Sequence, residues 1–304
     1  GDHRDLHSFP TTTLFRSFFN THYIVLSVAD RDDNLKDLNY ASQSLVATLN
    51  DYGVKPLIEE EGSAPEDSPF VVYSKLCSPI SRPLPKVHGA VGAQLNQLLT
   101  ADHIHFTGEN GVIKFFSGDR ELYEVVMGIR SSGDYMDEAM VASLLAIDCE
   151  LVLLHNVRPI FKPQARALLM QQQRMAAMTS FSGDVIEQYG VVLAAIEESD
   201  SDHQALTEYA MAILLRGESK EEIDYAEGEV QRICRLFSVT PVREGWVAQA
   251  TFFNQFPTYE TLPRTYRYLS RVVATAISFD KPSEGFSKSD WGPGAISIFR
   301  TTSG

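Results

Sequence analysis

The sequence has few cysteines, and their spacing excludes the sites that cysteines usually build. Only Cys77, Cys149 and Cys234 occur in 304 residues. Their number is odd and no Cys-x-x-Cys pair is present, so neither a disulfide framework nor a cysteine-based zinc site is expected. The pattern indicates a protein that works in a reducing compartment.

Long apolar runs are also absent. The most apolar stretches, such as Cys149 to Leu154 and Ala210 to Leu215, are strand-sized and much shorter than the roughly 20 residues that span a bilayer. We therefore predict no transmembrane segment. The first residues, Gly1 to Arg4, include neither an initiator methionine nor the basic head and apolar centre of a signal peptide. This start suggests a piece of a longer polypeptide.

The common catalytic and nucleotide-binding motifs are missing. A P-loop needs Gly-x-x-x-x-Gly-Lys-Ser/Thr, so that backbone amides surround the phosphates and the lysine reaches them, and no such run exists here. His-Glu-x-x-His, Gly-x-Ser-x-Gly and a Gly-x-Gly-x-x-Gly after a strand are absent too. A catalytic set assembled in space from distant residues stays open. We expect no catalytic, cofactor-binding or metal-binding residues in this chain.

Positive charge is scarce. The chain has 26 Lys and Arg against 40 Asp and Glu, a formal net charge of −14. This balance argues against direct nucleic-acid binding, because phosphate contacts depend mainly on Lys and Arg. Hydrophobic residues make up 44% of the chain, which suffices for one large core or two medium ones. An acidic cytoplasmic protein with protein partners and two or three subdomains is the expectation.

The first 130 residues predict an α/β subdomain that contains a β-hairpin. Residues 23–28 and 54–58 read as strands on either side of a helix over residues 33–52, which Gly53 ends. After an acidic loop and a short helix at 91–99, strands are predicted at 103–107 and 112–116. Asn110-Gly111 suits a two-residue turn between them, with Gly111 left-handed. A third strand at 122–129 should pair beside the hairpin.

Two histidines of this hairpin form a weak candidate for a metal site. His103 and His105 are two residues apart on a strand, so they share one face. A metal would need further ligands, and the sequence offers only the distant His88 or an unplaced carboxylate. We interpret the pair as partly exposed strand histidines.

Residues 131–245 predict a second subdomain of ferredoxin-like type. A helix at 136–147 precedes a strand at 149–157, a long helical region from Pro163 to about Glu198, a strand at 206–215, a helix at 220–237 and a strand at 239–243. This order matches a split βαβ sheet. The predicted fold is thus α/β (α+β), with tandem ferredoxin-like split βαβ units over 1–130 and 131–245, and a C-terminal helical segment over 246–304.

The segment from residue 246 onward has the most specific pattern. It reads as an aromatic helix at 247–256 closed by Pro257, a second helix opening at Pro263, a polar loop, and a strand at 295–299 entered through a Trp-Gly-Pro cluster. The residues that stand out are Ala250, Gln255, Phe256, Pro257, Arg264, Arg271, Trp291, Gly292, Pro293, Thr302, Ser303 and Gly304. Their order resembles the segment that leads into the motor domain of the large ATPases of type IV secretion and conjugation systems, the CagE/TrbE/VirB family.

This resemblance implies a function. The chain would be the N-terminal docking and assembly region of a secretion ATPase that energises pilus assembly and the transfer of DNA or protein. It would contact inner-membrane subunits at the cytoplasmic face of the bacterial inner membrane. ATP and Mg²⁺ would belong to a C-terminal motor domain missing from this chain, and the full-length protein would self-associate as a hexamer or dimer. The alternative is a self-contained α/β enzyme or binding domain with an unrecognised site.

A basic stretch in this segment is a candidate interaction face. From residue 263 onward there are six basic residues against three acids, a net of +3, so the preceding 262 residues carry −17. Arg264, Arg267 and Arg271 have the spacing i, i+3, i+7, which places them on one face of the predicted helix. That face is either solvated or contacts an acidic surface of a neighbouring subunit or the motor domain.

Overall fold

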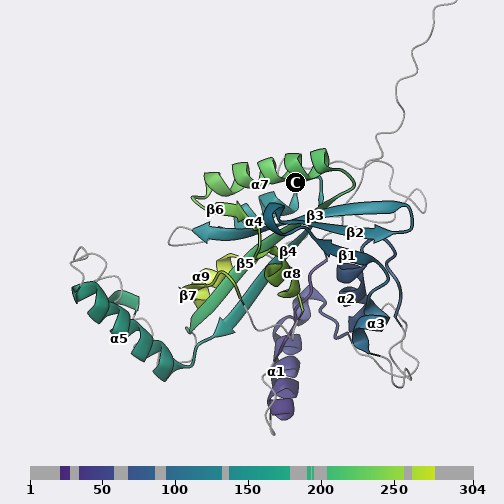
Figure 1. The fold of residues 1–304 in the computed structure, drawn as a ribbon. Coiled ribbons are helices and arrows are strands. Elements are labelled where there is room, and N and C mark those ends of the chain that lie inside the picture. The colour runs from purple at the N-terminus through teal and green to yellow at the C-terminus, as the bar shows by residue number, and fades with distance from the viewer. Residues whose placement is uncertain are drawn as a thin grey trace, which may run out of the picture.

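The computed structural model describes nine stretches of the chain. They are residues 21–27, 34–57, 68–85, 94–131, 137–178, 190–192, 194, 204–256 and 262–277. The predicted α/β class is confirmed, since helices pack on both faces of a sheet in this part of the chain (Figure 1).

The described strands form one seven-stranded antiparallel sheet. Its main order is β1-β2-β3-β5-β4, while β6 pairs with β3 and β7 pairs with β5. The strands are β1 (His103–Phe106), β2 (Val112–Ser117), β3 (Arg120–Ser131), β4 (Glu150–Pro159), β5 (Leu206–Gly217), β6 (Thr240–Arg243) and β7 (Tyr266–Leu269).

The two longest strands, β3 and β5, organise this sheet. Residues 123–128 of β3 pair with β5, while β2 and β6 follow one another along the opposite edge of β3. In the same way β3 and β7 follow one another along one edge of β5, and β4 takes the other edge. Residues far apart in the sequence therefore meet at the middle of the sheet.

Two crossover connections give the sheet its order. Helix α4 (Glu138–Leu145) connects β3 to β4 with β5 between them, and α7 (Lys220–Leu236) connects β5 to β6 with β3 between them. These are split βαβ connections, and the resulting order is β6-β3-β5-β4. The first strand of this set, β3, also pairs with the hairpin. Strands on both sides of residue 130 thus belong to one sheet, and the predicted tandem arrangement is not what the sheet shows.

Helix α7 covers one face of the sheet together with α4. The Ser219 hydroxyl accepts a hydrogen bond from the Glu222 amide and caps the helix, as expected for serine at this position. Its apolar residues recur at helical spacing and are buried against α4 and the central strands. They are Ile223, Ala226, Val230 and Ile233. The predicted helix at 220–237 is confirmed.

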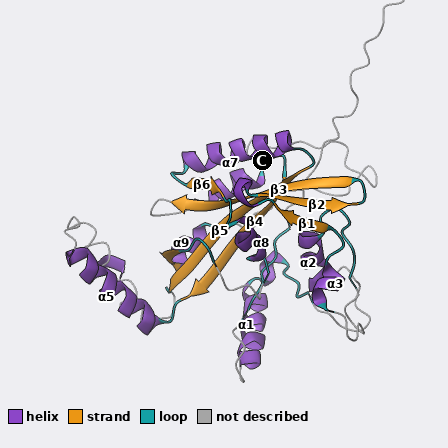
Figure 2. Cartoon of the chain, in the orientation of Figure 1, coloured by secondary structure: helices purple, strands orange, loops and turns teal. Residues whose placement is uncertain are grey.

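Helix α8 (Ala248–Phe253) covers the opposite face. Phe252 is fully buried and its ring lies 6.2 Å from that of Phe115 on β2. Helices α2 (Pro69–Cys77) and α3 (Leu95–Leu99) lie beside the hairpin, where Ser74 donates a hydrogen bond to the Leu99 carbonyl (Figure 2).

Three further helices lie at the border of the molecule. Among the described residues, the buried side chains of helix α5 (Lys162–Met178) are Ala165 and Leu169, which pack on β5 and β7. Helix α9 (Ser270–Thr275) follows β7 directly. Helix α1 (Asn34–Thr48) and a 3₁₀ turn (Asn50–Tyr52) end at Gly53 with a φ of +65°, as predicted. Both α1 and α5 extend away from the sheet in Figure 1. No helix in the described stretches is long and apolar enough to cross a membrane.

Three predicted elements are wrong. Residues 23–27 and 54–57 are not strands, so the βαβ-like unit around α1 does not exist, and Tyr23 to Leu26 are exposed. The helix predicted from Pro263 is also wrong, because residues 266–269 form β7 against β5. Tyr266 and Tyr268 alternate toward the core, so strand pairing overrides the helical spacing of the neighbouring arginines.

The predicted hairpin exists with a different loop. β1 and β2 pair as expected, and Gly111 is left-handed with a φ of +61°. The connection is a 3₁₀ turn (Gly108–Asn110) in which Gly108 is also left-handed, rather than a two-residue turn. Thr107 closes this longer loop, since its amide and its hydroxyl both donate to the Val112 carbonyl.

Candidate functional site

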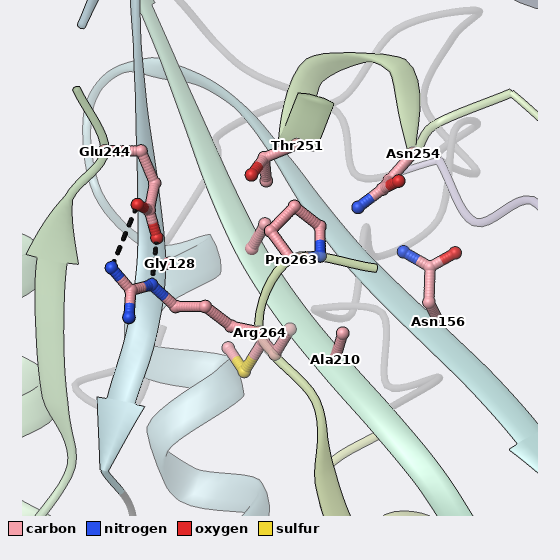
Figure 3. Close-up of a pocket in the computed structure, with 10 residues that line it drawn as sticks. Gly128, Asn156, Ala210, Glu244, Thr251, Asn254, Pro263 and Arg264 are labelled. Carbon is pink, nitrogen blue, oxygen red and sulfur yellow. Dashed lines mark hydrogen bonds and ion pairs between the residues drawn. The ribbon is translucent and has the colours of Figure 1, made fainter. Parts of the chain in front are cut away.

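A small pocket opens between the sheet and α8. Its floor consists of small residues of the central strands, Gly128 on β3 with Ala210 and Ala212 on β5. Helix α8 and the turn at Pro263 and Arg264 form its walls (Figure 3). The hollow exists because small floor residues leave space under the helix. Only about 10 Å³ of its space is free for a water-sized molecule, so the pocket is far smaller than a usual small-molecule site.

Polar side chains line the wall of this pocket. Asn156 on β4 and Asn254 after α8 face each other across it, with Thr251 beside them (Figure 3). Thr251 donates its hydroxyl to the Val247 carbonyl. The Asn254 Oδ1 atom is buried and has no hydrogen-bond partner among the described residues. Amides of this kind donate and accept hydrogen bonds and do not act as general acids or bases.

An ion pair closes one side of the pocket. The Arg264 guanidinium binds the Glu244 carboxylate through Nε to Oε1 and through Nη2 to Oε2 at 3.1 Å. The Glu244 side chain is 2% exposed. Hydrogen bonding to this carboxylate raises the pKa of Arg264. Arg264 thus anchors the turn before β7 to the sheet.

Two glycines make room for Glu244. A Cβ on Gly128 would lie 2.1 Å from the Glu244 Oε1 atom, and one on Gly111 would lie 1.6 Å from the Glu244 carbonyl oxygen. The Glu244 amide donates to the Val126 carbonyl at 2.8 Å. The hairpin loop, β3 and the turn before β7 therefore converge on one residue.

A second buried ion pair ties α2 to the sheet. Arg216 and Glu124 bind each other on adjacent strands with side chains 2% and 0% exposed. Arg216 also donates to the Leu76 carbonyl at the end of α2 and lies 3.6 Å from Glu150. Burial raises the pKa of Glu124, and Arg216 opposes that shift. The group is enclosed, so its role is structural.

The three predicted interface arginines lie on different elements. Arg264 is held in the pocket wall, Arg267 is on β7 at 3.8 Å from Glu208, and Arg271 is exposed on α9. They do not form one helical face. Of the family-motif residues, Gln255 is buried and its side-chain amide has no partner among the described residues. Pro257, Trp291, Gly292 and Pro293 lie outside the described residues.

The other candidate groups do not assemble a reactive centre in the described stretches. His103 and His105 are both exposed on β1, and no group of three or more His, Cys, Asp or Glu there is arranged to hold a metal ion. Burial raises the pKa of Cys77, Cys149 and Cys234 to about 11. Their thiols are therefore protonated and poor nucleophiles at neutral pH.

The comparison with family models decides the relationship. Residues 73–264 match the model of the CagE, TrbE, VirB family, described as a component of the type IV transporter system. The chain belongs to this family. The match contains every residue that lines the pocket and ends before Arg267, Arg271 and the Trp-Gly-Pro cluster. No match was found among curated proteins.

The family region contains residues that sequence reasoning did not single out. Glu244 follows β6 and meets Arg264 only because β6 and β7 lie against β3 and β5 in one sheet. Gly128 has neighbours typical of a buried strand, and a glycine inside a strand is the one local signal that backbone or side chains approach closely there. Asn156 and Asn254 carry no such signal.

Proposed function

We propose that this chain is a docking and assembly module of a type IV secretion ATPase. Membership of the CagE/TrbE/VirB family supports a place in a secretion system. The sequence lacks a P-loop, so its residues do not fit ATP or Mg²⁺, and these would act on a motor domain outside the 304 residues. The module would contact inner-membrane subunits at the cytoplasmic face of the membrane, in a machine that assembles a pilus and transfers DNA or protein.

The observation that carries this proposal is the outer edge of β4. This strand is ten residues long and ends the sheet order, and no described strand pairs with its outer edge. The Ile160 amide donates to the Leu206 carbonyl, which sets the alternation of the antiparallel ladder. Even-numbered residues thus pair with β5. The backbone groups of Leu151, Leu153, His155 and Val157 point outward.

An open edge of this length is a template for an extended peptide. An added strand gains affinity from main-chain hydrogen bonds and specificity from the side chains on either side. Proteins usually protect such edges with charges, prolines or bulges, and β4 carries them only at its two ends, with Glu150 at the start and Arg158 and Pro159 at the finish. We propose an extended segment of an inner-membrane subunit as the occupant.

A single substitution tests the edge. Val157→Pro removes an outward N–H without removing a bond to β5, so the chain should fold. Val157→Thr is the matched control, because it keeps the N–H and the β-branched shape. Each variant is co-purified with the individual inner-membrane subunits encoded beside this chain. We expect binding to one subunit that Val157→Pro weakens tenfold or more and Val157→Thr preserves.

The results of this experiment test the docking function and the β4 edge separately. If the wild-type chain binds none of these subunits, the docking function is overturned. If Val157→Pro binds as well as Val157→Thr, docking stands and the β4 edge is excluded.

Arg267 and Arg271 remain candidates for contact with an acidic surface. Both are exposed and lie on consecutive elements, β7 and α9, whereas Arg264 serves the fold. We propose that these two, without Arg264, meet an acidic neighbouring subunit or the motor domain. The double change Arg267→Glu, Arg271→Glu should leave the chain folded and disrupt assembly of the full-length protein. Normal assembly would exclude the role.

A further inference from the structure

The outer face of α7 has an unusual composition. While the inner face is buried on the sheet, the outer face is an exposed stripe along the whole helix. The exposed residues of the helix are Lys220, Glu221, Asp224, Tyr225, Gly228, Arg232, Arg235 and Leu236. Tyr225 and Leu236 are 68% and 71% exposed, which is high for large side chains. Figure 1 shows α7 along the border of the molecule with the sheet beneath it.

A glycine lies at the middle of this stripe. Gly228 is inside a 17-residue helix, where glycine is among the least favourable residues. A Cβ added there would meet nothing within 4 Å, so packing inside the chain does not require glycine. A missing side chain at the centre of an exposed helix face allows the backbone of another helix to approach closely.

The charges of the stripe are arranged symmetrically around Gly228. Asp224 and Arg232 lie four residues before and after it, and Glu221 and Arg235 lie seven residues before and after it. Apart from Lys220 at the first position of the helix, the exposed charges before Gly228 are acidic and those after it are basic. A parallel copy of this face would meet like charges, whereas an antiparallel copy centred on Gly228 meets opposite charges at all four positions.

We propose that α7 pairs with α7 of a second copy of this chain, antiparallel and crossing at Gly228. Asp224 then faces Arg232 of the partner subunit, and Glu221 faces Arg235 of the partner subunit. The exposed ring of Tyr225 covers the region of Gln231 of the partner subunit. The pairing is isologous, as in most homodimers.

The partners of these charged groups within the chain lie at the surface. Asp224 lies 3.7 Å from Arg243, and Arg232 binds both carboxylate oxygens of Glu229 on the same helix, with Nη2 at 2.8 Å. Exposed pairs of this kind contribute little to stability, so they can rearrange at low cost when a partner helix arrives. One pair of helices buries less surface than a typical stable interface, so we expect a weak dimer that salt weakens further.

Charge reversal tests the pairing and its direction. Glu221→Arg with Asp224→Arg makes the face basic, and Arg232→Glu with Arg235→Glu makes it acidic. Each double variant should raise the dimer dissociation constant tenfold or more in sedimentation equilibrium. The quadruple variant exchanges the two halves, keeps the net charge and should dimerise like the wild type.

Gly228→Leu provides a readout that a solvated helix would not show. A side chain at this position has open space in the free chain, and leucine favours helix, so the melting temperature at low concentration should rise. The same side chain obstructs the crossing point, so the dissociation constant should rise at least tenfold. If Gly228→Leu raises the melting temperature and weakens the dimer, Gly228 lies at the contact between the two helices.

The pairing of α7 does not depend on the docking function, because dimerisation is measured with the purified chain alone. A monomeric wild-type chain at about 1 mM in low salt would overturn it, since even a weak interface forms dimers at that concentration. A dimer that none of the variants weakens would overturn it as well.

Discussion

At the scale of single residues, two ion pairs tie distant elements to the sheet, and one of them uses Arg264, which the sequence had suggested for an interaction face. Arg264 closes on Glu244, and Arg216 closes on Glu124 beneath α2. Both carboxylates are almost fully enclosed, and burial of a charge is costly unless it is paired. The contribution of such a pair to stability is therefore seen when one of its two residues is replaced.

Removing Arg216 should destabilise the chain severely. Arg216→Met leaves the Glu124 carboxylate buried without a cation and the Leu76 carbonyl without its donor, at a cost of about 3–5 kcal/mol. The double variant with Glu124→Met removes the unpaired charge and should be clearly more stable than Arg216→Met alone. Denaturant unfolding of the two variants and the wild type checks this. A double variant less stable than the single one would contradict it.

The same substitution gives a pH signature. Burial already raises the pKa of Glu124, and loss of Arg216 removes the cation that opposes the shift. In Arg216→Met the folded chain therefore binds a proton more readily than the unfolded chain does. Its stability relative to the wild type should recover as pH falls from 7 toward the unfolded pKa of about 4.3. A pH-independent difference would show that the carboxylate is not the cause.

His155 should make the chain sensitive to acid. Burial lowers the pKa of His155 to about 4, and its Nδ1 lies 2.8 Å from the Tyr209 hydroxyl. Below about pH 6.5 the unfolded chain takes up a proton that the folded chain does not. Stability should therefore fall between pH 6.5 and 4, by up to about 3 kcal/mol from this residue.

Two variants separate the proton from the hydrogen bond at this position. His155→Asn keeps a polar atom near Nδ1 and cannot titrate, so its unfolding free energy should depend less on pH in that range. Tyr209→Phe removes the hydrogen bond and keeps the imidazole, so its pH dependence should persist. Equal slopes for His155→Asn and the wild type would assign the acid sensitivity to other groups.

At the scale of elements, the hairpin loop shows how conformation and packing combine. Gly111 and Gly118 flank β2 and both have a φ near +60°. Alanine at Gly118 has open space, so it should cost about 1 kcal/mol from the left-handed backbone alone. Alanine at Gly111 also meets the Glu244 carbonyl at 1.6 Å, so it should cost about 3 kcal/mol or more.

The quantity to measure is the difference in unfolding free energy between these two variants. Unfolding of Gly111→Ala and Gly118→Ala under the same conditions isolates the contact with Glu244, because the conformational cost is common to both. Equal losses would mean that the hairpin loop does not pack on Glu244.

Elements with strong local patterns could be predicted from the sequence. The period of Ile223, Ala226 and Val230 indicated α7, and Asn110-Gly111 between two apolar runs indicated the hairpin. Strand β7 could not be predicted, because its four residues pair only with the part of β5 that β3 leaves open. The strands predicted around α1 are wrong because a strand-like sequence also needs a partner strand. In the described sheet no strand pairs with residues 23–27.

The candidate site was harder to predict than the elements. Its floor is made of Gly128, Ala210 and Ala212, whose common property is small size, and the sequence does not show that they meet. Glu244 and Arg264 are 20 residues apart and pair through the sheet. Such contacts follow from strand order, which depends on the two crossover connections through α4 and α7.

At the scale of the whole molecule, the family region coincides with the sheet and its two helical faces. Residues 73–264 include β1 to β6 and both crossover helices, while β7 and α9 follow. Within the described residues, this region leaves the outer edge of β4 without a paired strand and exposes the outer face of α7, which covers one face of the sheet. Two independent contacts, one with a different protein and one with a second copy, fit this arrangement.

The last prediction concerns nucleotide. Phosphate binding needs convergent backbone N–H groups and a free cation, as a glycine-rich loop with its lysine provides. The chain has no such loop, and the arginine at its pocket is already bound to Glu244. Calorimetric titration of the 304-residue chain with Mg²⁺ and a non-hydrolysable ATP analogue should therefore show no saturable binding.

A variant makes this titration informative about the pocket. Glu244→Gln removes the negative charge that binds Arg264, so the guanidinium becomes available to phosphate. Weak binding of the analogue by this variant alone would therefore agree with the absence of binding by the wild type. Micromolar binding by the wild-type chain would contradict this prediction. A phosphate would then have to displace the Glu244 carboxylate, which is 2% exposed and forms two hydrogen bonds with the arginine. Such a result would place a nucleotide site in this chain and favour a self-contained enzyme over a docking module.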